Sequence, residues 1–226
     1  MRLPRAESAH ARSRRVRPGD PVLLVDGGGA EASARVIRVS KEGLEVAVER
    51  VGEAKAPAAP ISLLVAAVRL ERLSWIVEKA TELGASRLVL LAAGRTQSFR
   101  ATAAVSARLA RVARAAAKQS GAAAWPEIAG PIAAPEAFAA ETAPIRFVLD
   151  ASGASFPAAL APAPAAIAIG PEGGWAPGEL AAAASLGWSA ARLPAGTLRA
   201  ETAAVAALAL LRAARERGES APGTSV

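Results

Sequence analysis

The chain has 226 residues and a formal net charge of +7, from 27 basic and 20 acidic residues. It contains no cysteine and a single histidine, His10, which excludes a disulfide, a thiolate metal site and a multi-histidine metal site. The apolar stretches are too short for a membrane span and no secretion signal opens the chain, so we expect a cytoplasmic protein without a membrane partner or a bound metal. The excess of arginine favours a nucleic acid partner, but a GC-rich genome raises arginine equally well.

Residues 1 to about 50 have the pattern of short strands. The apolar run 21–25 ends in Asp26-Gly27-Gly28-Gly29, which is typical of a hairpin turn, and residues 34–40 and 44–48 alternate apolar with polar side chains. Several short strands joined by glycine turns indicate a small β-barrel. Residues 52–60 are rich in alanine and proline and are expected to form a linker.

After the linker, strand and helix patterns alternate. This alternation predicts an α/β fold, with a parallel sheet covered by helices on both faces. We expect Gly84 and Gly218 to end helices, and residues 219–226 to form a disordered tail. The expected strands are 61–68, 87–91, 145–150, 165–170 and 189–193, and the expected helices are 72–83, 105–118, 177–185 and 201–217.

The expected helix 105–118 has one apolar face and one basic face. A basic face is most often simply solvated, but no acidic residue lies within this segment to balance its charge. A stripe that binds RNA phosphates is therefore a competing interpretation. Val105, Leu109, Val112 and Ala116 share the apolar face, while Arg108, Arg111, Arg114 and Lys118 share the other at spacings of three and four residues.

Two polar motifs follow the ends of predicted strands near the C-terminus. They are Gly170-Pro171-Glu172-Gly173-Gly174 and Leu198-Arg199-Ala200-Glu201-Thr202-Ala203. Ligands of parallel sheets bind at the carboxyl ends of strands, so both motifs are expected at one ligand site. The glycines permit a sharp turn and a close approach of backbone to ligand, although neither GxGxxG nor a P-loop is present.

Four sequence blocks, in this order, closely resemble the ribosomal small-subunit RNA methyltransferase E family (RsmE) of the SPOUT superfamily. They are Trp75-Ile76-Val77-Glu78-Lys79-Ala80-Thr81-Glu82-Leu83-Gly84, Lys118-Gln119-Ser120-Gly121, Ile169 to Trp175, and Gly196 to Ala203. The resemblance spans essentially the whole chain. It implies methylation of N3 of one uridine in the decoding region of 16S rRNA, with S-adenosylmethionine as cofactor.

The resemblance also implies an architecture and an assembly. A PUA-like β-barrel that helps to bind RNA would occupy residues 1–55, and a SPOUT-type α/β domain with a deep trefoil knot would occupy residues 61–218. The family works as a homodimer, with the cofactor bound near the interface. The implied substrate is 16S rRNA within the small ribosomal subunit.

The motif positions assign candidate site residues. Arg199 is our candidate for stabilising the charge that develops on the uracil oxygens. Glu172 or Glu201 either accepts the N3 proton or orients Arg199 and the loop amides. We favour orientation for Glu201, because it opens a helix. The cofactor-binding candidates are Leu149, Asp150, Ile169, Gly170, Glu172, Gly173, Gly174, Leu193, Gly196, Leu198, Arg199, Ala200 and Thr202. The RNA-binding candidates are Arg15, Arg17, Lys79, Arg95, Arg108, Arg111, Arg114, Lys118 and Gln119.

The chain departs from the family pattern at several positions, which affect the expected RNA contacts more than the cofactor loops. Lys118 and Ala122 replace a usual Glu and Arg, residues 194–197 form an altered turn, and Arg69 replaces a frequent Lys. The usual first strand before His10 is expected to be missing. Two alternatives stay open: a SPOUT ribose 2′-O-methyltransferase, and a non-catalytic rRNA-binding assembly protein.

Overall fold

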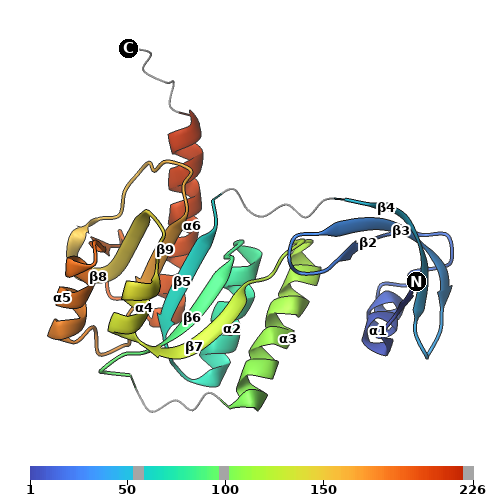
Figure 1. Cartoon of the computed structure of the whole chain (residues 1–226), viewed down its shortest axis with the longest axis horizontal. Helices are drawn as coiled ribbons and strands as arrows, with labels where there is room; N and C mark the ends of the chain where they lie inside the picture. Colours follow the sequence, from blue (N-terminus) through green and yellow to red (C-terminus); the bar gives the residue numbers. More distant parts are fainter. Residues whose placement is uncertain (53–58, 97–101, 221–226) are drawn as a thin grey trace. The chain divides into compact units, whose positions relative to one another are not determined.

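The computed structural model describes residues 1–52, 59–96 and 102–220 (Figure 1). The chain divides into two compact units, residues 1–56 and 57–226, and each is described by itself. Most of the expected linker (53–58) and of the expected tail (221–226) lies outside the described residues.

The first unit is a four-stranded antiparallel sheet with one helix. Strands β2 (Pro21–Val25), β3 (Glu31–Val39) and β4 (Leu44–Val51) follow one another in space, and β1 (Arg2–Leu3) pairs with β4. The predicted turn after β2 is confirmed, because Asp26 Oδ1 accepts hydrogen bonds from the amides of Gly28 (2.7 Å) and Ala30 (3.1 Å). A small core of Ala11, Ala34, Val36, Leu44 and Val46 fills the space between helix and sheet.

Two expectations for this unit were wrong. Residues Arg5–Ser13 form helix α1 and not a strand, and a strand that we expected to be missing, β1, precedes it. Both elements were hidden for a physical reason. Helix α1 buries only small residues deeply, Ser8 and Ala11, so it lacks an apolar stripe, and β1 is two residues long.

The second unit contains a six-stranded parallel sheet, as predicted. The strand order is β10-β8-β9-β5-β6-β7, which places β9, β5 and β6 side by side. The strands are β5 (Ile61–Ala66), β6 (Arg87–Ala92), β7 (Glu127–Ala133), β8 (Ile145–Ser155), β9 (Ala165–Ile169) and β10 (Ser189–Arg192). The helices are α2 (Leu70–Glu82), α3 (Ala103–Ser120), α4 (Ala134–Ala140), α5 (Pro177–Ser185) and α6 (Ala200–Ser220).

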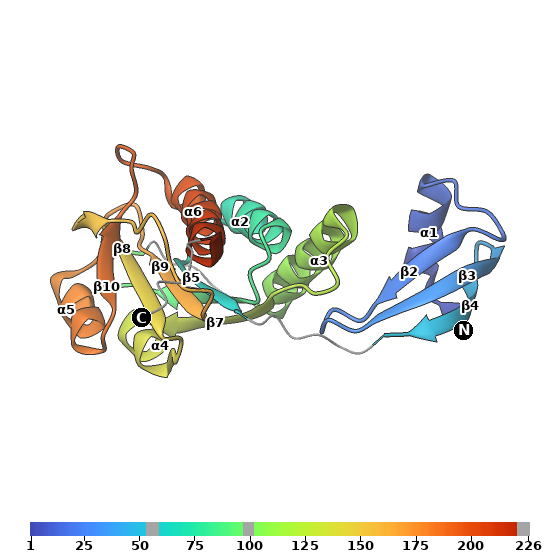
Figure 2. The ribbon, with the colours of Figure 1, turned by 90° about the horizontal axis from the view of Figure 1, so that it is seen from above.

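Helices cover both faces of this sheet, which confirms the predicted α/β architecture. Figure 2 shows α2, α3 and α6 on one side and α4 and α5 on the other. Each layer has its own apolar core: Leu73, Ile76, Leu109 and Leu208 belong to the first, and Phe138, Trp175 and Trp188 to the second.

Three details differ from the sequence analysis. Strand β7 and helix α4 were not predicted, because β7 is interrupted by Gly130-Pro131 and α4 is only seven residues long. Gly84 ends α2 with a positive φ of 71°, as expected. Gly218 does not end α6, which continues to Ser220. A Cβ at Gly218 would collide with the carbonyl of Leu160, so this glycine permits close packing.

Candidate functional site

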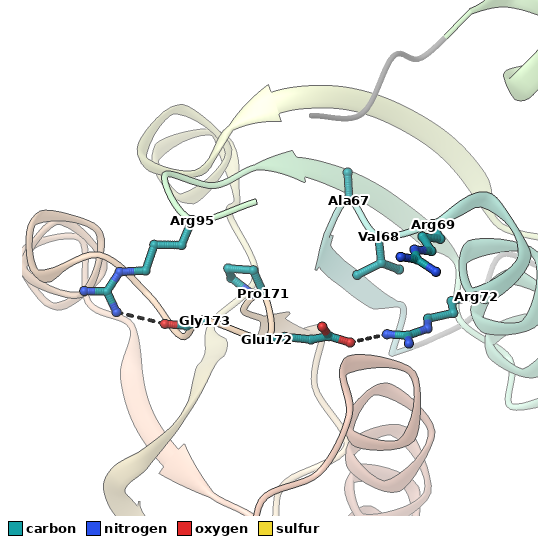
Figure 3. A pocket seen from close by; sticks show the side chains of 8 residues that line it. All are labelled: Ala67, Val68, Arg69, Arg72, Arg95, Pro171, Glu172 and Gly173. Carbon is teal, nitrogen blue, oxygen red and sulfur yellow. Dashed lines mark hydrogen bonds and ion pairs between the residues drawn. The ribbon is translucent and has the colours of Figure 1, made fainter. Parts of the chain in front are cut away.

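A cavity of about 170 Å³ opens at the carboxyl ends of the three neighbouring strands β9, β5 and β6 (Figure 3). Its walls come from the segment after β5, the first turn of α2, the segment after β6 and the glycine loop after β9. The lining residues are Ala67, Val68, Arg69, Arg72, Arg95, Pro171, Glu172 and Gly173. The glycine motif therefore lies at the sheet edge where the sequence placed a ligand site.

Arg72 connects the two motifs that the sequence singled out. Its Nη1 donates a hydrogen bond to Glu172 of the first motif, and its Nε lies 3.6 Å from Oε1 of Glu201 in the second. The hydrogen bond to Glu172 and then the charge of Glu201 raise the pKa of Arg72 above its ordinary value. The two candidate catalytic carboxylates thus share one guanidinium.

Sequence reasoning did not select Arg72 as a site residue. It was placed only at the start of a helix, where its side chain reads as one more solvated charge. Its single usable signal was its place in the first turn of a helix that follows a buried strand of a parallel sheet.

The glycine loop is held by contacts on several sides. Gly174 adopts a positive φ of 71° and its amide donates to the carbonyl of Pro171 (2.8 Å). Arg95 Nη1 donates to the carbonyl of Gly173 (2.8 Å), as Figure 3 shows. The indole of Trp175 lies under Gly170, where an added Cβ would stand 2.9 Å from the ring. These contacts leave the loop little freedom.

Trp175 also connects the glycine loop to the third predicted cofactor edge. Its Nε1 donates to the carbonyl of Leu149 (2.9 Å), the half-buried residue that precedes Asp150 in β8. The Asp150 carboxylate accepts hydrogen bonds from the amide and the hydroxyl of Ser152 (2.9 and 2.5 Å). The structure therefore brings the Leu149 edge and the glycine loop together.

Glu179 is a further positioning residue that the sequence analysis did not select as part of the site. Its buried carboxylate accepts one hydrogen bond from the amide of Gly94 (2.7 Å) and another from the amide of Ala176 (2.8 Å). The first bond holds the segment that carries Arg95, and the second caps α5 directly after the glycine loop. A glutamate in the first turn after Pro177 signals the cap, whereas only the fold shows the bond to Gly94.

The second motif is partly buried. Leu193 and Leu198 are half-buried and Ala200 is buried against the core, whereas Gly196, Arg199 and Thr202 are exposed. Within the part of the chain that the structure describes, the Arg199 side chain makes no hydrogen bond or ion pair, and it does not line the cavity. Its catalytic role stays a prediction.

The candidate RNA-binding cations are distributed over both units. Arg108, Arg111 and Arg114 are exposed on α3, as the helical spacing predicted, and Arg114 lies 5.5 Å from the centroid of the Trp125 ring. Lys118 and Gln119 follow in the last turn of α3, and Arg15 and Arg17 are exposed in the first unit. These roles stay predictions.

Lys79 is occupied by acidic neighbours on its own helix. Its Nζ donates to Glu78 (2.7 Å) and Glu82 (2.8 Å), and these bonds raise the pKa of Lys79. Among the described residues, no three potential metal ligands cluster, and no helix is long and apolar enough to cross a membrane.

Comparison with known proteins gives the same family for both units. A family profile described as "RNA methyltransferase domain" matches residues 54–212, and one described as "RNA methyltransferase PUA domain" matches residues 3–49. Proteins named Ribosomal RNA small subunit methyltransferase E from Mycobacterium bovis and Synechocystis sp. are 35% and 30% identical to the chain. Each alignment covers 89% of this chain, and 82% and 69% of those relatives.

Solved structures agree with these matches. The structure of a ribosomal RNA small subunit methyltransferase E from Neisseria gonorrhoeae bound to S-adenosyl methionine has a TM-score of 0.83 at 25% identity, and covers 94% of this chain and 90% of that one. A methyltransferase from Legionella pneumophila, solved with SAM, has a TM-score of 0.82 at 25% identity and covers 95% and 91%. These findings confirm the resemblance inferred from the four sequence blocks and the PUA-like character of the first unit. The chain therefore belongs to the ribosomal RNA small subunit methyltransferase E family.

Proposed function

We propose that this protein transfers the methyl group of S-adenosylmethionine to N3 of a uridine in the 16S rRNA of the small ribosomal subunit. One observation carries the proposal. In a chain of this family, Arg72 joins the two predicted cofactor motifs beside a cation-lined cavity at the carboxyl ends of parallel strands. The named relatives are small-subunit rRNA methyltransferases, and solved relatives carry the cofactor.

The residues of the two loops suit the cofactor. Oε2 of Glu201 is buried and has no hydrogen-bond partner among the described residues, so a donor from a ligand would complete it. The loop 169–174 and the segment 193–202 would hold the cofactor between them, with Leu149 at the third edge. When bound, S-adenosylmethionine supplies a methyl group activated by a sulfonium.

Positioning is the main task of these residues, because a methyl transfer requires nucleophile, carbon and leaving group in line. We assign to Arg199 the stabilisation of the negative charge that develops on the uracil oxygens. Glu172 and Glu201 are paired with Arg72, and protonation of either would weaken that pairing. For this reason we assign both carboxylates to orientation of the loops more than to removal of the N3 proton.

The remaining family features are part of the same proposal. They are a deep trefoil knot around the cofactor loops, a homodimer, RNA binding by the first unit, and action in the cytoplasm on the small ribosomal subunit. The exposed arginines of α3 support an RNA partner, because cations at helical spacing suit a phosphate backbone.

The deciding experiment is nucleoside analysis of 16S rRNA from a strain in which the gene is deleted. We expect 3-methyluridine to disappear and to return when the gene is restored. Loss of a ribose-methylated nucleoside instead would favour the 2′-O alternative. If the purified protein bound no S-adenosylmethionine in a calorimeter, the non-catalytic alternative would hold.

A further inference from the structure

The cavity beside the glycine loop is strongly cationic. Three guanidinium groups line it, from Arg69, Arg72 and Arg95, and the only carboxylate in its lining is that of Glu172. Figure 3 shows Arg69 and Arg72 on one side of the loop and Arg95 on the other. The cavity therefore favours an anionic ligand.

The three arginines differ in what already engages them. Arg72 is paired with Glu172 and Glu201, so its charge is compensated. Arg95 is held by the carbonyl of Gly173, a neutral group that fixes the side chain but leaves its charge. Arg69 is exposed and, among the residues that the structure describes, its side chain has no hydrogen bond or ion pair. Arg69 is thus the guanidinium with all its donors available.

The cavity does not have the composition or the size expected of the cofactor pocket itself. Neither Leu149 and Asp150 nor any residue of 193–202 lines it, so it touches only one of the three predicted cofactor edges. Its volume of about 170 Å³ is also below the roughly 300–1,000 Å³ typical of sites for cofactor-sized ligands. It is large enough for a single small anionic group.

We propose that Arg69 binds a backbone phosphate of the RNA substrate adjacent to the nucleotide that is methylated. This inference rests on the proposed function, and adds to it the residue that anchors the RNA next to the cofactor loop. The planar fork of a guanidinium matches two phosphate oxygens at once. The charge of Arg95 adds to the attraction, and the contact with Glu172 keeps Arg72 from competing for the same phosphate.

The test compares full-length Arg69→Gln and Arg69→Lys proteins with a matched control, Arg87→Gln. Arg87 begins β6 at the opposite edge of the same sheet, so its substitution removes the same charge away from the cavity. The substrate is small ribosomal subunits from the deletion strain, with S-adenosylmethionine labelled in its methyl group. Three quantities are measured: the KM for subunits, the Kd for S-adenosylmethionine by calorimetry, and the salt dependence of subunit binding without cofactor.

We expect Arg69→Gln to raise the KM for subunits about tenfold, the scale of one lost charge-assisted contact. The slope of log affinity against log salt concentration should fall by about 0.7–0.9, as for one lost phosphate contact. Arg69→Lys should keep the salt slope of the wild type with an intermediate KM. Arg87→Gln should match the wild type in the Kd, the KM and the salt slope.

Two outcomes would overturn the proposal. If Arg69→Gln weakened S-adenosylmethionine binding as much as it raised the KM, the cavity would hold the cofactor carboxylate instead. If KM and salt slope were both unchanged, no phosphate would bind there. Failure of the proposed function is separable, because a wild type that transfers no methyl group to subunits would still report the Arg69 contact through salt-dependent binding.

Discussion

The Nε atom of Arg72 lies 3.6 Å from Oε1 of Glu201, which joins the first turn of α2 to the first turn of α6. The same guanidinium donates to Glu172, so one side chain links a helix to both motifs of the predicted site. The side chains of Arg72 and Glu201 are 30% and 16% exposed, and partial burial reduces screening of their attraction by solvent. We regard this pairing as the element that sets the spacing of the two loops.

Replacing Arg72 with Gln should weaken S-adenosylmethionine binding about tenfold, because both carboxylates lose the charge-assisted contact that positions their loops. Calorimetric titration checks this value. Arg87→Gln is the control for a lost charge elsewhere on the domain and should leave the Kd unchanged. A double substitution, Arg72→Gln with Glu172→Gln, should cost less than the sum of the two single changes. Strict additivity would contradict a shared network.

Arg199→Ala should lower the rate of methyl transfer by about 10²–10³-fold, as expected when a donor to developing charge is removed. The Kd for S-adenosylmethionine should change by less than about threefold, because the assigned role is in the transition state. Single-turnover rates with small subunits, together with calorimetry, measure the two effects separately. A variant that binds cofactor normally and methylates at the wild-type rate would remove Arg199 from the mechanism.

Gly170→Ala should destabilise the protein by about 1–3 kcal/mol, because its Cβ would stand 2.9 Å from the Trp175 ring and force the loop or the indole to move. Chemical denaturation of purified protein gives the free energy of unfolding. Gly178→Ala is the matched control. A Cβ at Gly178 meets nothing within 4 Å, and the residue lies in α5, so this change should be neutral or slightly stabilising. Equal effects of the two changes would contradict the packing argument.

Glu179→Gln should cost about 1–3 kcal/mol of stability, because an amide cannot accept hydrogen bonds at both of its ends. One of the amides of Gly94 and Ala176 would then face a donor. Glu136→Gln, in the first turn of α4, is the control, because Glu136 is exposed and should contribute only about 0.3–1 kcal/mol through the helix dipole. Urea denaturation of both variants measures the difference, and equal losses would argue against the double acceptor role.

A double change, Arg108→Gln with Arg111→Gln, should weaken RNA binding and reduce its salt dependence. Two lost phosphate contacts predict a fall in the slope of log affinity against log salt concentration of about 1.4–1.8. Binding to small subunits at several salt concentrations measures this slope. Arg87→Gln again controls for net charge. A slope equal to that of the wild type would mean that the basic face of α3 is only solvated.

The elements with a strong pattern were predictable from sequence, and the weakly patterned ones were not. The apolar stripe of α2 and the two-faced α3 follow from 3.6-residue periodicity. Helix α1, strand β7 and helix α4 were missed because each is short or buries little, so its formation depends on neighbours that only the fold supplies. Gly218 was assigned as a helix end, but its role is to let α6 approach the carbonyl of Leu160.

By itself the sequence determined the family, the alternation of strands and helices, and the two loops at strand ends, since these depend on local pattern and on motif order. Only the tertiary structure decided which distant groups meet: Arg72 with Glu172 and Glu201, Glu179 with Gly94, and Trp175 with Leu149. The physical reason is that these contacts join side chains to charges or backbone groups far away along the chain. No periodicity encodes such pairs, and the packing of helices on the sheet brings them within hydrogen-bonding distance.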